Sequence, residues 1–161
     1  MAFIALGSNL GDSRKILLDA MGRLQNLSLA PILKSSLWQT SPVDCPPDSP
    51  KFLNAAVALE PLAGETPETL LEKLQAFESG FGRQPKTILN EPRLLDLDLI
   101  AFGLEKRSSD RLSLPHPRAH RRQFVLQPLR EIAPDLVLPG QTRTVAQLLA
   151  GLVGDERCER I

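Results

Sequence analysis

The sequence predicts an α+β fold with a ferredoxin-like βαββαβ core, in which an antiparallel sheet carries both helices on one face, followed by C-terminal additions. Apolar runs of strand length and stretches of helical spacing follow one another in the order strand, helix, strand, strand, helix, strand. The chain has 161 residues, which suits one compact domain over residues 1–161. Its hydrophobic content of 42% and charged content of 24% are ordinary for a soluble globular protein.

The first half of the chain is expected to hold one helix and three strands. Residues 2–6 form an apolar run that ends at a glycine, as a buried strand opening into a turn does. Asp12 or Ser13 can cap the helix, whose apolar residues at helical spacing are Leu17, Met21, Leu24 and Leu27. Residues 32–40 and 52–60 are the expected second and third strands. The prolines between them predict an extended loop over residues 41–51.

The second half begins with a helix that Thr66 caps and Pro67 starts. One apolar face of this helix holds Leu70, Leu71, Leu74 and Phe77, and the helix should end near Gly80 or Gly82. Residues 83–92 have neither helical nor strand period and contain two prolines, which predicts a mobile loop. The remaining elements expected are a core strand at 94–102, a hairpin strand around 111–114, a short helix from about 118 and a helix near 144–152.

Composition and charge exclude several classes of function. A net charge of zero argues against a general nucleic-acid binder. No uniform run of about eighteen apolar residues exists to cross a membrane, and no leader is evident, so we expect a cytoplasmic protein. Cys45 and Cys158 form no metal-binding pattern and are expected to be unpaired thiols. Residues 83–122 nevertheless carry nine Lys or Arg against five Asp or Glu, which suits a negatively charged ligand.

Two aspartates, Asp96 and Asp98, interrupt the apolar stretch RLLDLDLI. Because residues two apart on a strand point to the same face, these carboxylates should lie side by side while the leucines face the other way. Neighbouring carboxylates repel, so the arrangement is stable mainly when a cation lies beside them. Magnesium with a phosphate-bearing substrate fits, because that ion commonly takes one or two carboxylates and completes its shell with water and phosphate oxygens. A merely acidic, solvated strand face is the alternative.

Cationic and aromatic side chains accompany the aspartate pair. Candidates for holding a polyphosphate are Arg83, Arg93, Arg111, His116, Arg118, His120, Arg121 and Arg122. Some of them, such as Arg118 or Arg121, are expected to be ordinary solvated surface, and His116, fixed between two prolines, can instead be structural. No GxxxxGK[ST] run is present to form a P-loop. Phe52 and Asn54 share a strand face that can hold a flat heterocycle, although core packing alone would explain the phenylalanine.

Taken in order, these stretches resemble the 6-hydroxymethyl-7,8-dihydropterin pyrophosphokinase family, which transfers pyrophosphate from ATP to a pterin alcohol in folate biosynthesis. The motifs run from about residue 3 to 139: GSNLGD, TSPV, FLNAAV, a glutamate separated from GR by three residues (Glu78 to Arg83), PRLLDLDLI, LPHPRAH and RQFVLQPLREIAP. The pattern PR, two residues, DLDLI and the pattern PHPR are the most specific pieces. The products implied are AMP and the pterin diphosphate, formed when the pterin hydroxyl attacks the β-phosphorus of ATP, with no dedicated base assigned.

The resemblance also implies roles for individual residues. Asp96 and Asp98 would be the ligands of two magnesium ions and, with Arg83 and Arg93, the catalytic set. Residues implied to grip the triphosphate are Arg83, Arg93, His116 and Arg122, and those implied near the nucleotide are Gln75, Glu78, Leu99 and Arg111. Residues implied to line the pterin site are Thr40, Pro42, Val43, Phe52, Asn54 and Phe124. The partners expected are ATP and the pterin, with no nucleic acid or membrane, and the protein is expected to be a monomer.

Two other functions are consistent with the same residues. A metal-dependent nuclease or phosphohydrolase also needs paired carboxylates and arginines, but it has no use for the aromatic and amide pair at Phe52 and Asn54. A non-catalytic module that binds a nucleotide or a pterin is the second alternative. The aspartate pair, Asp96 and Asp98, argues against this alternative, because a module that only binds its ligand does not need two metal ligands.

The chain departs from the family pattern in the segment expected to close over the ligands. Where the family usually has WGPR, this chain has Asn90, Glu91, Pro92 and Arg93, and it has Pro85, Trp38 and Asp44 in place of a basic residue, a tyrosine and a glycine. We therefore expect the usual reaction with altered substrate affinity or turnover.

Replacing Asn90 by tryptophan tests this expectation. The substitution restores the aromatic side chain of the family pattern, so KM for ATP or for the pterin, or the turnover number, should change in steady-state assays. Unchanged constants would contradict it.

Overall fold

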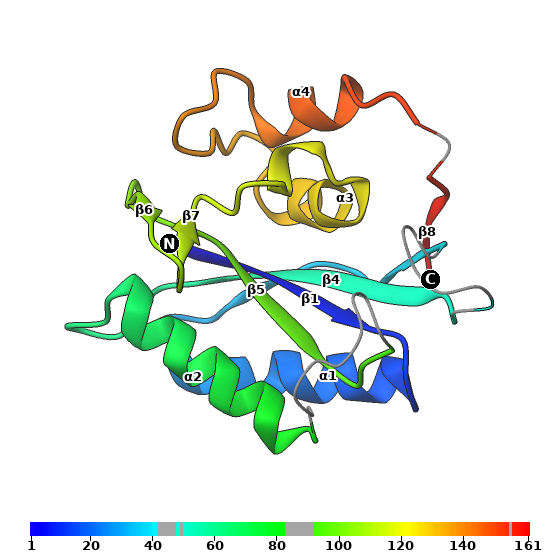
Figure 1. The fold of residues 1–161 in the computed structure, drawn as a ribbon, viewed down its shortest axis with the longest axis horizontal. Coiled ribbons are helices and arrows are strands. Elements are labelled where there is room, and N and C mark those ends of the chain that lie inside the picture. The colour runs from blue at the N-terminus through cyan, green and yellow to red at the C-terminus, as the bar shows by residue number, and fades with distance from the viewer. Residues whose placement is uncertain (42–47, 49, 83–91, 155) are drawn as a thin grey trace.

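A central antiparallel sheet separates two layers of helices in the computed structural model, which describes residues 1–41, 48, 50–82, 92–154 and 156–161 (Figure 1). The strand order is β5-β1-β4-β3-β8, and β2 also pairs with β4. The bounds of these strands are β1 (Ala2–Ser8), β2 (Leu33–Lys34), β3 (Trp38–Thr40), β4 (Phe52–Leu59), β5 (Asp96–Phe102) and β8 (Cys158–Arg160). The expected mixture of helices with an antiparallel sheet is confirmed.

The helices cover both faces of this sheet. On one face lie α1 (Ser13–Leu24) and α2 (Pro67–Gly80), and on the other lie α3 (Gln123–Ile132) and α4 (Val145–Ala150) (Figure 1). The smaller elements are the 3-10 turns η1 (Gln25–Leu27) and η2 (Ala119–Arg121) and a hairpin of β6 (Arg107–Ser108) with β7 (Ser113–Leu114). None of the helices in the described part of the chain is long and apolar enough to span a bilayer.

The central strands are apolar on both faces because both faces are covered. Along β1, Ile4 and Leu6 pack with α1 and α2, whereas Phe3 packs with α3 and α4. Along β4, Val57 faces the first layer and Ala56 the second. These strands therefore appear in the sequence as continuous apolar runs rather than as alternating ones.

Helices α1, α2 and α4 each begin after a residue whose side chain caps them. The side chain of Asp12, rather than Ser13, accepts a hydrogen bond from the backbone of α1. Thr66 forms a capping box with Thr69 at the start of α2, and Thr144 caps α4 in the same way. The second helix ends at Gly80, as expected.

The single strand expected over residues 32–40 is wrong, because it is interrupted between β2 and β3. Ser35 makes this break: its backbone N–H donates to the carbonyl of Ala56 (2.9 Å), while its hydroxyl accepts from the Ala56 N–H (2.8 Å). A side-chain oxygen thus replaces a backbone carbonyl in the ladder, and the next residue, Ser36, turns its N–H to Glu131 of α3.

Other boundaries also differ from expectation. The core strand β5 begins at Asp96 instead of residue 94, and the strands β6 and β8 were not expected. The short helix expected from about 118 is a 3-10 turn followed by the ten-residue helix α3.

A buried glutamate joins the end of α2 to the start of β5. Glu78 is only 4% exposed, and its Oε1 atom accepts a hydrogen bond from the backbone N–H of Leu97 at 2.7 Å. Leu97 lies between the two aspartates, so this contact helps to fix their position on the strand.

Replacing Glu78 by alanine should lower the free energy of unfolding by about 1–3 kcal/mol, because the buried N–H of Leu97 loses its acceptor. Urea unfolding followed by circular dichroism measures the change. Glu72→Ala is the matched control, since this glutamate lies on the same helix in an exposed pair with Arg111 and should cost less than about 1 kcal/mol. Equal losses for both variants would contradict the role given to Glu78.

Candidate active site

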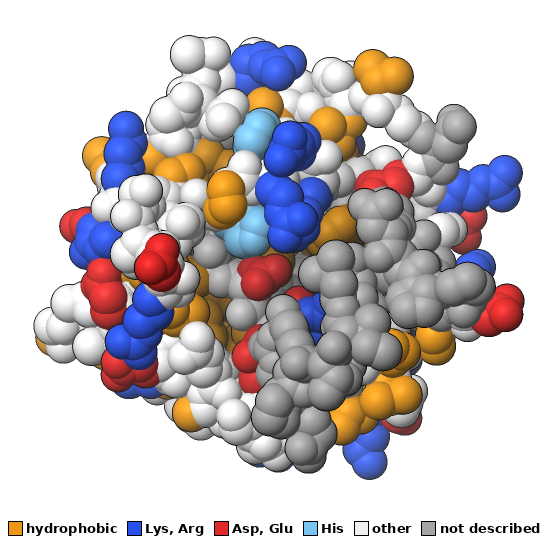
Figure 2. Space-filling model, in the orientation of Figure 1, with side chains coloured by type: hydrophobic (Ala, Val, Ile, Leu, Met, Phe, Trp, Pro, Cys, Tyr) orange, Lys and Arg blue, Asp and Glu red, His pale blue; other side chains and the backbone are white. Residues whose placement is uncertain are grey.

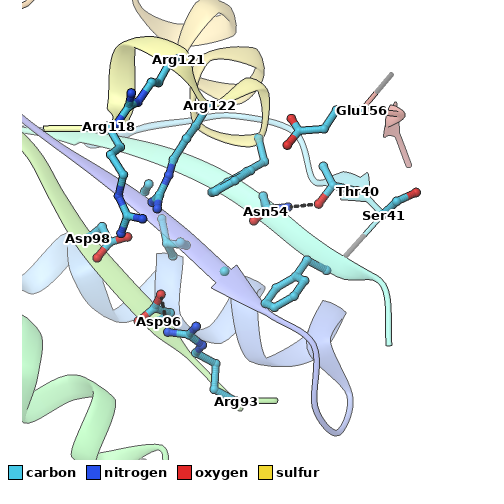
Figure 3. Close-up of a pocket in the computed structure, with 15 residues that line it drawn as sticks. Thr40, Ser41, Asn54, Arg93, Asp96, Asp98, Arg118, Arg121, Arg122 and Glu156 are labelled. Atoms are coloured by element: carbon cyan, nitrogen blue, oxygen red, sulfur yellow. Dashed lines mark hydrogen bonds and ion pairs between the residues drawn. The ribbon is translucent and has the colours of Figure 1, made fainter. Parts of the chain in front are cut away.

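A cavity of about 460 Å³ lies over β1, β4 and β5 on the α3 face of the sheet (Figure 3). It brings together segments that are far apart in the chain. Sequence-predicted residues that line it are Thr40, Phe52, Asn54, Arg93, Asp96, Asp98, Arg122 and Phe124. The cavity therefore has an anionic pair, a set of arginines and an aromatic end within one space.

The aspartate pair lies at the edge of the cavity on β5. Its neighbour β1 places Gly7 opposite Asp96 and Ala5 opposite Asp98, and both small residues also line the cavity. Small side chains on the central strand leave space between the larger side chains of the flanking strands. The two carboxylates lie on the same face of β5, as predicted, and both line the cavity.

Arg93 is tied both to this pair and to the end of β1. Its guanidinium lies 3.0 Å from an oxygen of Asp96. Its backbone N–H donates to Oδ1 of Asn9 at 2.9 Å, and its carbonyl accepts from the Asn9 N–H at 3.2 Å. Arg93 Nε is buried and has no hydrogen-bond partner within the part of the chain that the structure describes. That donor is suited to an anionic ligand.

Three more arginines line the cavity from the segment that leads into α3: Arg118, Arg121 and Arg122. Arg118 and Arg122 reach toward the aspartates (Figure 3). Arg118 and Arg121 are exposed, as expected, but their place in the cavity wall means that they are more than ordinary solvated surface. On this face of the molecule, Lys or Arg and His side chains gather beside acidic ones (Figure 2).

Partial burial and neighbouring positive charges lower the pKa values of two cationic groups near the aspartates, Arg122 and His116. Burial and the neighbouring charge of Arg118 lower the pKa of the Arg122 guanidinium, and Asp98 and Asp96 oppose that shift. Burial, followed by the charges of Arg122 and Arg118, lowers the pKa of His116 to about 4. The His116 imidazole is therefore neutral near pH 7, and its Nδ1 accepts a hydrogen bond from the backbone N–H of Arg118 at 3.2 Å.

The aromatic end of the cavity is built on β3, β4 and the start of α3. Asn54 and Thr40 are 5% and 4% exposed, and the Asn54 amide nitrogen donates to the Thr40 hydroxyl at 2.8 Å. This bond orients the amide of a residue that core packing does not explain. Phe52 and Phe124 line the same space, and the guanidinium of Arg122 lies 5.3 Å from the centre of the Phe124 ring.

Other predicted residues lie away from the cavity or outside the described residues. Arg111 is exposed and pairs with Glu72 on α2, where Gln75 is also exposed. Leu99 is part of the core beneath the sheet, and the Glu78 carboxylate binds the Leu97 backbone. His116 is half-buried beside the arginines and is not part of the cavity lining. The predicted residues or segments that fall outside the described residues are Pro42, Val43, Asp44, Cys45, Arg83, Pro85, Asn90 and Glu91.

Three described polar residues at or beside the cavity were not foreseen: Asn9, Ser41 and Glu156. Asn9 carried a signal, since it lies in the GSNLGD motif that was read from the sequence. Ser41 directly follows the predicted Thr40. Glu156 lies in the C-terminal segment, where no motif or periodicity marks it.

The carboxylates of the described cavity limit how the expected magnesium could be held. Within the described residues, no group of three or more His, Cys, Asp or Glu side chains could hold a metal ion. Two carboxylates alone suit magnesium that arrives with a polyphosphate, because water and phosphate oxygens complete its shell. They do not suit a structural site that the protein must enclose by itself.

Comparison with known proteins agrees with the motifs. Residues 3–134 match the model of the family described as 7,8-dihydro-6-hydroxymethylpterin-pyrophosphokinase (HPPK). The chain is 39% identical over 164 residues to the 2-amino-4-hydroxy-6-hydroxymethyldihydropteridine pyrophosphokinase of Methylorubrum extorquens, and the match covers 98% of each. The protein of the same name from Pseudomonas aeruginosa is 40% identical over 151 residues, covering 92% of this chain and 89% of the relative.

Longer proteins contain a similar segment. The chain is 36% identical over 151 residues to folic acid synthesis protein fol1 of Pneumocystis carinii, of which it spans only 20%. Its fold is similar to the crystal structure of wild-type Plasmodium falciparum HPPK-DHPS with pteroate, with a TM-score of 0.68 and 14% identity over 92% of this chain and 41% of that one. The resemblance seen in the ordered motifs is confirmed, and the chain belongs to the 7,8-dihydro-6-hydroxymethylpterin-pyrophosphokinase family.

Proposed function

We propose that the cavity over β1, β4 and β5 is the site at which this ATP-dependent pyrophosphokinase of folate biosynthesis acts on 6-hydroxymethyl-7,8-dihydropterin. The observation that carries the proposal is that one cavity holds the carboxylate pair, the arginines and an aromatic end with a buried amide. A polyphosphate and a flat polar ring can thus be held next to each other. A phosphohydrolase would need only the first of these features.

The pterin ring occupies the aromatic end. Phe52 and Phe124 offer ring faces for stacking, and Asn54 and Thr40 offer polar atoms whose orientation their mutual hydrogen bond fixes. Pro42 and Val43 belong to the proposed pterin site on sequence grounds. The hydroxymethyl group then points toward the carboxylate pair, where the phosphates lie.

The triphosphate occupies the charged end. Arg93 and Arg122, together with Arg83, hold its oxygens, and Arg118 and Arg121 add positive charge from the cavity wall. Arg93 must exchange its ion pair with Asp96 for phosphate, and its buried Nε is a donor that a phosphate oxygen can satisfy. His116 approaches the phosphates from beside Arg118 and Arg122.

The other residues proposed near the nucleotide lie outside the cavity, on α2, β5 and the segment between β6 and β7. Gln75 and Arg111 are exposed on the α2 side of β5 and can reach a nucleotide that extends beyond the cavity. Glu78 and Leu99 are buried, so their part is to hold β5 and its aspartates in place.

Asp96 and Asp98 would hold two magnesium ions that arrive with ATP. When bound, magnesium neutralises phosphate charge and lowers the pKa of an alcohol that it coordinates. The protein itself places two carboxylates beside the arginines that line the cavity, so that both positive and negative groups surround the polyphosphate.

The reaction is then an in-line displacement. The pterin hydroxyl oxygen forms a bond to the β-phosphorus of ATP, the bond from that phosphorus to the α-phosphate oxygen breaks, and AMP leaves with the electron pair. The hydroxyl proton passes to solvent, with no side chain assigned as a base. Positioning of the ring by Phe52 and Phe124 and charge neutralisation by the arginines should supply most of the rate, because phosphoryl transfer needs little covalent help from the protein.

We further propose a ferredoxin-like core with C-terminal additions, in a single domain over residues 1–161. Two observations support it: β5 lies beside β1 and β1 beside β4, and the elements follow one another in the order β1, α1, β2 and β3, β4, α2, β5. The sequence favours a cytoplasmic monomer with ATP and the pterin as its partners, without nucleic acid or membrane.

Replacing Asp96 by alanine should reduce the formation of AMP roughly a hundredfold or more, because one of the two carboxylates proposed to hold magnesium is lost. The assay mixes protein, ATP, magnesium and the pterin and separates AMP from ADP by chromatography. In the unaltered protein AMP should form only when the pterin is present. Asp19→Ala is the matched control, since this aspartate lies on α1 in an exposed pair with Arg23 and should leave the rate unchanged.

ADP as the product, or ATP hydrolysis without the pterin, would instead indicate a phosphohydrolase. Binding of ATP without any turnover would indicate a non-catalytic binding module.

The titration of His116 should respond to the nucleotide. Its pKa is about 4 in the free protein, and a bound triphosphate stabilises the charged imidazolium, so the pKa should rise and the protein should take up a proton as ATP binds below neutral pH. Proton NMR of the two histidines with and without magnesium and α,β-methylene-ATP measures this, and His116→Gln assigns the resonance. A pKa that the nucleotide leaves unchanged would place His116 away from the phosphates.

A further inference from the structure

We propose that Glu156, from the C-terminal segment, is a specificity-determining residue that accepts hydrogen bonds from the amino and ring N–H groups of the pterin. The inference rests on the proposed function, because it adds a contact to the same ring site. Glu156 lies outside residues 3–134, the part of the chain that matches the family model.

The geometry of the tail brings Glu156 to the aromatic end of the cavity. β8 pairs with β3 so that Cys158 lies opposite Thr40, and Glu156 comes two residues before this pair. Glu156 lines the cavity together with Thr40, Asn54 and Phe124. Figure 3 shows its carboxylate directed inward from the tail, on the same side as Thr40 and Asn54 and opposite Asp96 and Arg93.

The carboxylate lies at the start of α3. The backbone N–H of Gln123, the first residue of α3, lies beside it and favours its charged form. The residue before it, Arg122, makes no side-chain cap hydrogen bond. Glu156 therefore brings a carboxylate from a distant part of the chain to the N-terminal end of α3, where the helix dipole favours negative charge.

The tail itself is anchored well enough to keep this position. The N–H of Ile161 donates to the carbonyl of Leu37 at 3.0 Å, beyond the end of the β3–β8 pairing. Arg160 of β8 lies 3.7 Å from Glu131 of α3, and that glutamate also accepts from the Ser36 backbone. The segment after Glu156 is therefore tied to both β3 and α3.

The chemistry of a carboxylate suits one edge of the pterin. An ionised carboxylate only accepts hydrogen bonds and has about four lone-pair positions, so it has capacity for two ligand donors even with the Gln123 N–H beside it. The 2-amino group and the neighbouring ring N–H of the pterin are two donors on one edge. Asn54 and Thr40 each both donate and accept, so they discriminate less strongly between rings that differ at this edge.

The local environment supports such a contact. Burial raises the pKa of Glu156, while the Gln123 N–H and the charge of Arg122 partly offset that shift. A partly desolvated carboxylate forms stronger hydrogen bonds with a ligand than a solvated one does.

The test compares two ligands on two proteins. Dissociation constants are measured by isothermal titration calorimetry, with magnesium and α,β-methylene-ATP present, for 6-hydroxymethyl-7,8-dihydropterin and for its analogue with hydrogen in place of the 2-amino group. The unaltered protein should bind the amino-bearing ligand at least about tenfold more tightly. Glu156→Gln keeps an acceptor for the Gln123 N–H but loses the charge, so this preference should fall to about threefold or less.

Two further variants keep the result interpretable. Glu159→Gln removes an exposed carboxylate from the same strand and should leave both dissociation constants unchanged. Glu156→Asp keeps the charge but shortens the side chain; it should show an intermediate preference, and it replaces the glutamine variant if that protein does not fold.

Several results would overturn the inference. If Glu156→Gln weakens both ligands by the same factor, the residue only caps α3; if it weakens neither, the residue does not touch the ring. Failure of the unaltered protein to bind the pterin overturns the proposed function and this inference with it, and that outcome is visible before any variant is measured.

Discussion

β1 pairs with β4 on one side and with β5 on the other, and this pairing sets the position of the polar side chains that β4 and β5 contribute to the cavity. Its register places Gly7 between Asn54 and Asp96, and Ala5 beside Asp98. Small side chains on the central strand form a floor, and larger polar side chains on the neighbouring strands form two walls. A shift of one residue on β5 would turn the carboxylates into the core and the leucines into the cavity.

Charge balance is the second requirement of this arrangement. Two carboxylates close together are tolerated because arginines from two distant segments face them. Arg93 pairs with Asp96, and Arg122 is held among both aspartates and Arg118. The same groups that stabilise the free cavity are those that a polyphosphate with its cations would engage. Polyphosphate binding there would exchange one set of ionic partners for another, which would limit the cost of taking charges out of water.

The C-terminal third of the chain covers the remaining open side of the sheet. Helices α3 and α4 bury the apolar residues of β1 and β4 on that face, and the turn before α3 carries the arginines that overlook the aspartates. β8 then extends the sheet next to β3 and brings Glu156 to the cavity. Elements that complete the hydrophobic core thus also complete the lining of the cavity.

The order of the core elements, the shared face of Asp96 and Asp98, and the family could be predicted from the sequence, because strand periodicity, caps and ordered motifs are local features. The structure was needed to find the break at Ser35, the pairing of β8, the cavity positions of Arg118, Arg121 and Glu156, and the place of Arg111 outside the cavity. These depend on contacts between segments that lie far apart in the chain. No local pattern encodes which distant backbone a short strand will pair with, or which of several arginines will face inward.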